Sequence, residues 1–197
     1  MARLSIVGIS GNVARPSRTR TLVDALLAEA RARGLVDTRS FDIVDAGPEI
    51  GASLSRDGAS ESVDRILSAI ENADVLIAAS PVYKASYTGL FKHLFDLLDP
   101  KALEGRHVLL AATGGSDRHA LVIEHQLRPL FSFFGAHILP VSIYAVNCDF
   151  ENSGELAPSI VPRIARAVDQ ITALSPRGSA TGHGASTNRI SLIQHVA

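Results

Sequence analysis

The stretch LSIVGISGNVARPSRTRT, residues 4–21, joins an apolar segment to a polar loop, and it decides the fold. Its first six residues, LSIVGI, are typical of a short strand that is buried on both faces of a parallel sheet. The loop that follows is rich in hydroxyl and arginine side chains and leads into a helical pattern. We therefore expect a central strand that ends beside a helix N-terminus, where backbone N–H groups and the helix dipole favour an anion.

Outward from this stretch, apolar runs alternate with helical stripes along the whole chain. The pattern predicts strands at residues 4–9, 39–44, 74–79, 107–112 and 137–146, a loop at 46–60, and helices near 22–34, 63–70, 90–98, 117–134 and 157–174. Strands that alternate with helices form a parallel sheet covered on both faces. Five such units fit an α/β, flavodoxin-like, doubly wound sheet of strand order 2-1-3-4-5. We expect one domain over residues 1–174 and a partly mobile C-terminal tail at 175–197.

The composition narrows the class of partner. Of the 197 residues, 46% are apolar and 20% are charged, and the net charge is −1, so neither a nucleic acid nor an anionic membrane is expected as the main partner. The single cysteine, Cys148, cannot form an internal disulfide, and we expect it as a small buried side chain. The N-terminus lacks a signal-peptide pattern and no apolar run is long enough to span a bilayer, which predicts a cytoplasmic protein.

Three loops are expected to form the functional site. In an open α/β sheet, ligands bind beyond the carboxyl ends of the strands, near the point where the strand order reverses. This rule selects the loops at residues 10–21, 80–87 and 113–119. These are also the loops of unusual composition, so topology and local chemistry indicate the same place.

Each loop has a functional interpretation and a simpler one. In the first, the hydroxyls of Ser17 and Thr19 can bind phosphate oxygens, although an N-cap in a polar turn would use similar residues. In the second, Tyr83 offers an aromatic wall for a flat heterocycle, or it packs on the core. In the third, Gly114 and Gly115 allow a backbone to approach a ligand closely.

No motif for acid–base, nucleophilic or metal catalysis stands out. The histidines are scattered, without the close spacing of a zinc site. Ser10 does not lie in a Gly-x-Ser-x-Gly elbow. The first loop is neither a Walker A loop nor a Gly-x-Gly-x-x-Gly loop, so a dinucleotide is not expected there. A phosphate cradle beside a planar pocket, without such machinery, suits a cofactor that performs its own chemistry.

The same loops resemble those of the NAD(P)H-dependent FMN reductases. SGN at 10–12 with PSRT at 16–19 resembles their FMN-phosphate loop, SPVYKASYTGLFK at 80–92 their second flavin loop, and ATGGS at 112–116 their third. The resemblance covers roughly residues 3–172. Within the family, the chain is similar to the reductases that supply reduced FMN to alkanesulfonate, methanesulfonate and related sulfone monooxygenases.

The resemblance implies FMN and NAD(P)H as cofactors and a flavin-dependent monooxygenase as partner. Nicotinamide would pass a hydride to the flavin, so that no side chain serves as a catalytic acid or base. Homodimers or homotetramers are expected, and apolar residues at 90–98 and 131–134 suggest buried subunit contacts. The cofactor-binding residues implied are Ser10, Asn12, Ser17, Arg18, Thr19, Pro81, Val82, Tyr83, Lys84, Thr113, Gly114, Gly115 and Ser116.

Several alternatives remain open at this point. Arg15, Arg18 and Arg20 all lie near the expected phosphate, and Arg18 is our choice for its partner. His125 either forms a π-bulge, as in sulfonate-type reductases, or lies on a regular helix. The runner-up function is an enzyme with tightly bound FMN that reduces quinones, azo dyes or chromate. A flavodoxin-like electron carrier is the third interpretation, and the near-neutral charge counts against it.

Overall fold

A computed structural model describes residues 3–34 and 36–174, and their centre is a parallel sheet. The strand order is β2-β1-β3-β4-β5, and β6 pairs with β4 beyond the end of β5. The strands are β1 (Leu4–Ser10), β2 (Val36–Asp42), β3 (Val75–Pro81), β4 (His107–Thr113), β5 (His137–Ile138) and β6 (Ile143–Ala145). The expected flavodoxin-like fold is confirmed, whereas the tail at 175–197 lies outside the described residues.

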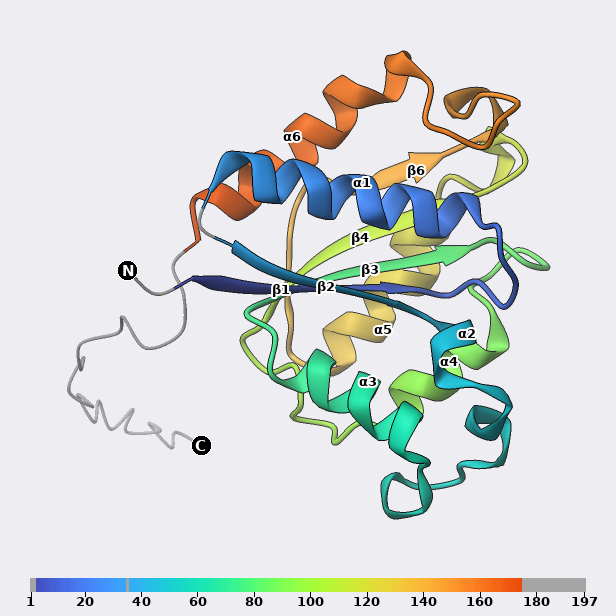
Figure 1. Cartoon of the computed structure of the whole chain (residues 1–197), viewed down its shortest axis with the longest axis vertical. Coiled ribbons are helices and arrows are strands. Elements are labelled where there is room, and N and C mark those ends of the chain that lie inside the picture. The colour runs from blue at the N-terminus through green and yellow to red at the C-terminus, as the bar shows by residue number, and fades with distance from the viewer. Residues whose placement is uncertain (1–2, 35, 175–197) are drawn as a thin grey trace, which may run out of the picture.

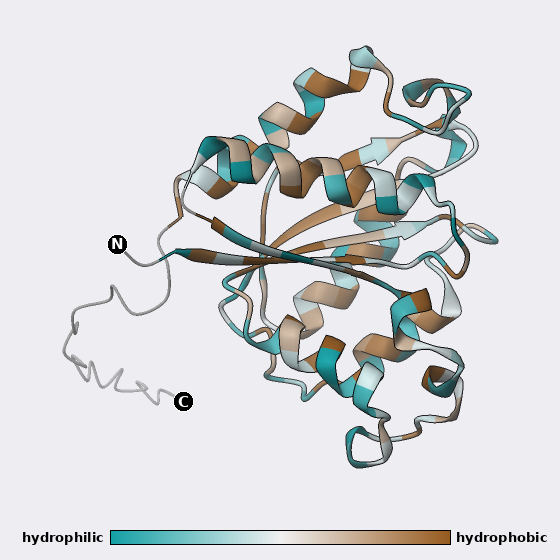
Figure 2. Cartoon of the chain, viewed as in Figure 1, coloured by the Kyte–Doolittle hydropathy of each residue, from teal (hydrophilic) through white to brown (hydrophobic). Residues whose placement is uncertain are grey.

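Helices cover both faces of the sheet (Figure 1). The helices α1 (Arg18–Arg33) and α6 (Val161–Thr172) lie on one face, and α3 (Glu61–Glu71), α4 (Gly89–Asp96) and α5 (Arg128–Phe133) lie on the other. Alternate residues of β1 supply the two cores, since Ile6 packs with α1 and α6 while Val7 packs with the opposite helices. Hydrophobic and hydrophilic bands alternate along these helices, as amphipathic packing requires (Figure 2).

The helix α1 packs closely on the middle of β1 because Gly8 has no side chain. A Cβ at this position would lie 2.5 Å from Cγ1 of Val23, closer than two carbon atoms can approach. Leu22, Leu26 and Leu27 on the same helix are buried against the sheet. This packing places the first turn of α1 beside the carboxyl end of β1.

Two strands differ from the prediction. The second strand was expected at 39–44, but β2 ends at Asp42, because the Asp42 side chain caps the short helix α2 (Ile43–Ala46) in a capping box with Asp45. The fifth strand was expected to run through 137–146, but it is divided into β5 and β6 on either side of Pro140. Proline cannot donate a ladder hydrogen bond, so a break at this point is expected.

The predicted long helix at 117–134 is not regular. It consists of the 3₁₀ turn η3 (Asp117–His119), the π-helix η4 (Ile123–Leu127) and α5. His125 lies within the π-helix, so the π-bulge interpretation is confirmed. The remaining short 3₁₀ turns are η1 (Pro48–Ala52), η2 (Arg56–Gly58), η5 (Asn147–Asp149) and η6 (Pro158–Ile160).

Two expectations about burial were wrong. Apolar residues at 90–98 and 131–134 were expected at subunit contacts, but Phe91, Leu94, Phe95, Phe131 and Phe134 lie in the core of the single chain. Of the three phenylalanines at 131–134, Phe133 is exposed, by 69%. Cys148 was expected to be buried, but it is exposed because it lies in the turn η5 rather than in a strand.

The loop after β3 ends in a tight two-residue turn. The N–H of Tyr83 donates to the carbonyl of Ser86 at 2.9 Å, and the N–H of Ser86 donates back at 3.1 Å. Between them, Lys84 and Ala85 have φ values of 51° and 67°. Such turns favour Asn-Gly, because left-handed backbone costs a residue with a Cβ about 1–2 kcal/mol. The turn is therefore strained.

Replacing Ala85 by glycine should stabilise the protein, because glycine adopts this backbone without strain. We expect Ala85→Gly to raise the melting temperature by about 2–4 °C, the effect of about 1 kcal/mol in a chain of this size. Thermal unfolding followed by circular dichroism measures it. The matched control is Ala28→Gly on the exposed face of α1, which should lower the melting temperature. A decrease for both variants would contradict strain in the turn.

Candidate functional site

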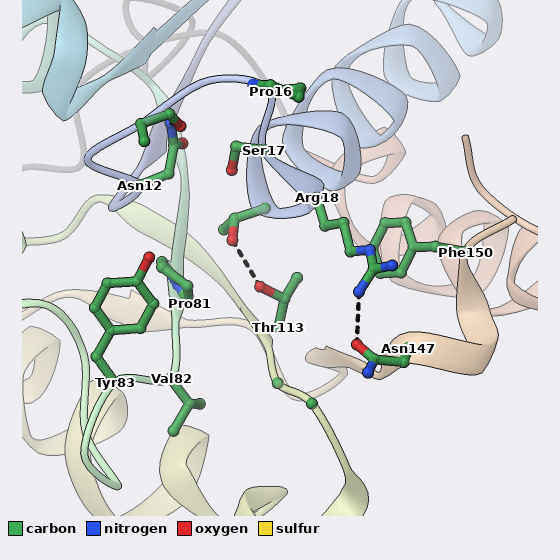
Figure 3. Close-up of a pocket in the computed structure, with 14 residues that line it drawn as sticks. Asn12, Pro16, Ser17, Arg18, Pro81, Val82, Tyr83, Thr113, Asn147 and Phe150 are labelled. Atoms are coloured by element: carbon green, nitrogen blue, oxygen red, sulfur yellow. Dashed lines mark hydrogen bonds between the residues drawn. The ribbon is translucent and has the colours of Figure 1, made fainter. Parts of the chain in front are cut away.

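An open pocket lies where β1, β3 and β4 end, as the topological rule predicted (Figure 3). Its volume is about 320 Å³. The loops after these strands form most of its lining, and the segment after β6 supplies the rest. The lining residues are Asn12, Ala14, Pro16, Ser17, Arg18, Thr19, Pro81, Val82, Tyr83, Thr113, Gly114, Gly115, Asn147 and Phe150.

Backbone hydrogen bonds extend the sheet into these loops. The N–H of Gly11 donates to the carbonyl of Ala79 at 2.8 Å, and that of Val82 donates to the carbonyl of Thr113 at 2.8 Å. The N–H of Gly114 donates to Ala145 at 2.9 Å. The three loops therefore leave the sheet at fixed positions relative to one another.

The first turn of α1 faces the pocket with polar groups. Ser17 is the N-cap, and its hydroxyl accepts a hydrogen bond from the N–H of Arg20 at 3.3 Å. Within the described residues, the N–H groups of Arg18 and Thr19 have no partner. The hydroxyls of Thr19 and Thr113 lie 2.6 Å apart and join α1 to the end of β4. Unpaired N–H groups at a helix N-terminus form a seat for an anion.

The arginines of the first loop differ in their partners. Arg15 pairs with Asp42 at 2.7 Å and with Asp45 at 2.5 Å, and these hydrogen bonds raise the pKa of Arg15 above its ordinary value. Arg20 pairs with Asp24 at 3.0 Å and with Asp45 at 3.2 Å. Both cations are therefore neutralised.

Arg18 has neutral partners instead. Its Nη1 donates to Oδ1 of Asn147 at 2.7 Å, and its guanidinium carbon lies 5.5 Å from the ring centre of Phe150 (Figure 3). In the described part of the chain, no carboxylate pairs with Arg18. Its charge is therefore available to a ligand in the pocket.

Asp45, one of the two carboxylates that hold Arg15, stays ionised at neutral pH. Burial raises the pKa of Asp45, but hydrogen bonds from Arg15 and from the backbone of Asp42 outweigh it, so the pKa lies below its ordinary value. The side chain of Asp42 is completely buried.

The opposite wall is flat and partly apolar. Pro81, Val82 and the half-exposed ring of Tyr83 form one side. At the other side, Gly114 allows Tyr144 to approach, since a Cβ on Gly114 would lie 2.0 Å from the Tyr144 hydroxyl. That hydroxyl donates to the carbonyl of Ser116 at 2.8 Å, and burial together with Asp117 raises its pKa above the ordinary value. The phenol therefore remains a hydrogen-bond donor at neutral pH.

Sequence reasoning missed two residues of the pocket wall, Asn147 and Phe150. They lie in and after η5, which follows the break in the fifth strand. Arg163 on α6 holds this turn by donating to both carboxylate oxygens of Asp149, at 3.0 and 3.2 Å, and to the carbonyl of Tyr144. The rule that ligands bind beyond strand ends applies to β6 too. The expected strand ran through residue 146 as one unbroken element, so the loop after it was not considered as part of the site.

Three of the expected binding residues do not line the pocket. Ser10 is buried and donates to Oδ1 of Asn12 at 2.5 Å. Lys84 is exposed at the tip of the strained turn. Ser116 contributes its carbonyl to Tyr144. The other ten expected residues come together around one cavity.

The arrangement suits a ligand with an anionic end and a flat body. The described residues contain no His, Cys, Asp or Glu cluster that could hold a metal ion. They also contain no helix long and apolar enough to cross a membrane. An anion seat beside a flat, partly apolar slot can accommodate a ligand that carries a phosphate on a planar ring system.

Comparisons with known proteins point to the same ligand. Residues 4–151 match the family described as NADPH-dependent FMN reductase. An FMN reductase (NADPH) of Pseudomonas aeruginosa is 47% identical over 86% of this chain and 91% of the relative. The NADH-dependent FMN reductase SfnF of Pseudomonas putida is 48% identical over 86% of this chain and 92% of the relative.

The comparison with solved structures also finds an enzyme named for FMN. The apo form of an NADH:FMN oxidoreductase, EMOB, has a TM-score of 0.76 and 33% identity, and the similarity covers 88% of this chain and 92% of that one. The chain therefore belongs to the family of NADPH-dependent FMN reductases, which are oxidoreductases, and it has their flavodoxin-like fold.

Proposed function

We propose that this enzyme binds FMN in the pocket described above, reduces it with NAD(P)H and releases it to a flavin-dependent monooxygenase. Membership of the family makes the chain an NAD(P)H:FMN oxidoreductase. The observation that carries the placement of the flavin is the uncompensated cation Arg18 at a capped helix N-terminus inside the pocket.

The phosphate would rest on the first turn of α1. This turn supplies the N–H groups of Arg18 and Thr19 and the hydroxyl of Ser17, and the side chain of Arg18 also lines the pocket. Asn12 also lines the pocket, and its side chain stabilises the loop by donating a hydrogen bond to the carbonyl of Ala14. Charge-assisted hydrogen bonds of this kind are the strong ones in anion recognition.

The isoalloxazine ring would lie between the second and third loops. Pro81, Val82 and Tyr83 would contact one edge, and Gly114 and Gly115 would allow the backbone to approach the other. FMN bound here would supply the redox chemistry, with NAD(P)H as the source of the hydride. The protein's own residues bind and orient both molecules, so no side chain needs to act as acid or base.

The pairing of the arginines favours a flavin that leaves. Arg15 and Arg20, on either side of Arg18 in the sequence, are occupied by carboxylates, so among the described arginines of the first loop only Arg18 would offer the phosphate an uncompensated charge. A weakly held flavin suits a reductase that passes reduced FMN to a monooxygenase of the sulfonate or sulfone type, and thereby serves sulfur metabolism.

Either nicotinamide, NADH or NADPH, is compatible with the relatives. Relatives of nearly equal identity are named for NADPH in Pseudomonas aeruginosa and for NADH in Pseudomonas putida. Arg15 and Arg20, two of the arginines that could meet the 2′-phosphate of NADPH, pair with aspartates instead.

Removing the free cation should weaken FMN specifically. We expect Arg18→Ala to raise the Kd of FMN by about tenfold, the usual effect of one charge-assisted hydrogen bond, and to leave riboflavin binding unchanged. Quenching of flavin fluorescence measures both. Arg31→Ala, on the same helix but bonded to Thr38, is the control and should bind FMN as the wild type does. Wild-type affinity in Arg18→Ala would refute the assignment.

The behaviour of the purified protein distinguishes the candidate functions. A flavin-releasing reductase should be colourless after extensive dialysis and should oxidise NAD(P)H only when FMN is added. A protein that stays yellow and reduces quinones without added flavin is the bound-FMN enzyme instead. A protein that binds FMN but oxidises neither nicotinamide is an electron carrier.

The π-helix η4 borders a face that we assign to subunit contact in a homodimer or homotetramer. A cavity of about 490 Å³ lies between this helix and α4, and Tyr87, Phe95, Leu98 and Phe133 are among its lining residues. Phe133 is 69% exposed beside it. An exposed aromatic residue at an apolar cavity is typical of an interface.

A charge on this face should reduce the oligomeric mass. We expect Phe133→Glu to shift the protein to a smaller species in size-exclusion chromatography with light scattering, because a carboxylate in an apolar interface is strongly disfavoured. Leu54→Glu is the matched control, since Leu54 is 88% exposed and does not line the cavity. An unchanged mass for Phe133→Glu would place the interface elsewhere.

A further inference from the structure

Asp42 is a buried carboxylate beside the first loop that does not reach the pocket. It is the last residue of β2, its side chain is 0% exposed, and it is absent from the pocket lining. Burying an ionised carboxylate is unfavourable unless donors surround it. Its partners therefore indicate what its burial stabilises.

Two of these partners, Asn12 and Arg15, belong to the loop between β1 and α1, and a third, Arg20 on α1, places its Nη1 3.4 Å from Oδ2. Oδ2 of Asp42 accepts from Nδ2 of Asn12 at 3.1 Å and from Nε of Arg15 at 2.8 Å. Oδ1 accepts from Nη2 of Arg15 at 2.7 Å and from the N–H of Asp45 at 3.1 Å. The pair with Arg15 is bidentate, so it sets the direction of the guanidinium as well as its distance.

Asn12 links Asp42 to two further residues, Ser10 and Ala14, by hydrogen bonds. Its Nδ2 also donates to the carbonyl of Ala14 at 3.0 Å, and its Oδ1 accepts from the hydroxyl of Ser10 at 2.5 Å. The carboxylate of Asp42, at the end of the neighbouring strand β2, thus fixes both Asn12 and Arg15 by hydrogen bonds. Ser17 and Arg18 follow directly in the chain, so their positions depend on this tie.

We propose that Asp42 is a positioning residue for the phosphate of FMN, which it serves by fixing the loop that presents Ser17 and Arg18. The inference rests on the proposed function, because it assumes that the phosphate binds at this loop. Asp42 itself touches neither phosphate nor flavin ring. Arg15 acts together with Asp42, because its guanidinium holds the loop in place and does not bind the ligand.

Simple electrostatics predicts the opposite effect, which makes the proposal testable. Asp42 places a negative charge near the seat of an anion, so its neutralisation should strengthen phosphate binding by Coulomb attraction alone. If Asp42 acts by holding the loop, its neutralisation should weaken phosphate binding instead. The sign of the change therefore distinguishes the two.

The experiment compares FMN with riboflavin, which lacks the phosphate, in the full-length protein. We expect Asp42→Asn to raise the Kd of FMN by about tenfold, as loss of a charged hydrogen-bonded pair does, and the Kd of riboflavin by less than about twofold. Fluorescence quenching gives both constants. A purely structural role would weaken both flavins equally, and that result, like tighter FMN binding, would overturn the proposal.

A second variant covers the case in which Asp42→Asn does not fold. Arg15→Lys keeps the charge but loses the bidentate pair, so we expect the same selective weakening of FMN. Asp24→Asn is the control, because Asp24 is a carboxylate that pairs with Arg20 and Ser40 and holds neither Asn12 nor Arg15. Wild-type FMN affinity in Arg15→Lys would count against the proposal.

The wild-type protein separates this inference from the proposed function. If it binds riboflavin as tightly as FMN, the phosphate seat is wrong and both proposals fall together. If it prefers FMN and Asp42→Asn retains that preference, the proposed function stands and only the role of Asp42 is lost.

Discussion

Hydrogen bonding between neighbouring strands continues past the point where the strands end, and the site depends on this continuation. Gly11, Val82 and Gly114 each donate from the start of a loop to the carbonyl of an adjacent segment. Parallel strands bring their carboxyl ends to one edge, and these bonds then fix the loops to one another there. Twelve residues from three separate loops consequently share a pocket of about 320 Å³.

The arginines around the pocket differ in whether a carboxylate neutralises them, so the attraction for an anion is concentrated near Arg18. Asp42 and Asp45 occupy Arg15, Asp24 occupies Arg20, and Arg18 remains beside the N-terminus of α1. Under the proposed binding mode this arrangement suits an enzyme that releases its flavin, because several uncompensated arginines would hold the phosphate more strongly than one. The buried Asp42 would then set the geometry of the loop, and Arg18 would set the affinity for the phosphate.

Much of this could be predicted from the sequence, and the exceptions have physical causes. Apolar runs such as LSIVGI report burial directly, so the sheet and its order were predictable. The end of β2 was misplaced because apolarity cannot distinguish Ile43 in a strand from Ile43 in the helix that Asp42 caps. The choice among three arginines required their partners, and Asp42 and Asp45 lie some thirty residues away. Asn147 and Phe150 were missed for a similar reason, since Pro140 ends the strand early.

The division of the fifth strand makes the two walls of the pocket unequal in stiffness. The wall carrying Ser17 and Pro81 follows central strands that are paired on both sides. The wall carrying Asn147 and Phe150 follows β6, three residues long and paired only with β4. Short edge segments open at lower free energy than a sheet centre. On the proposed binding mode, flavin would therefore enter and leave past the wall of Asn147 and Phe150, while the wall at the phosphate end stays rigid.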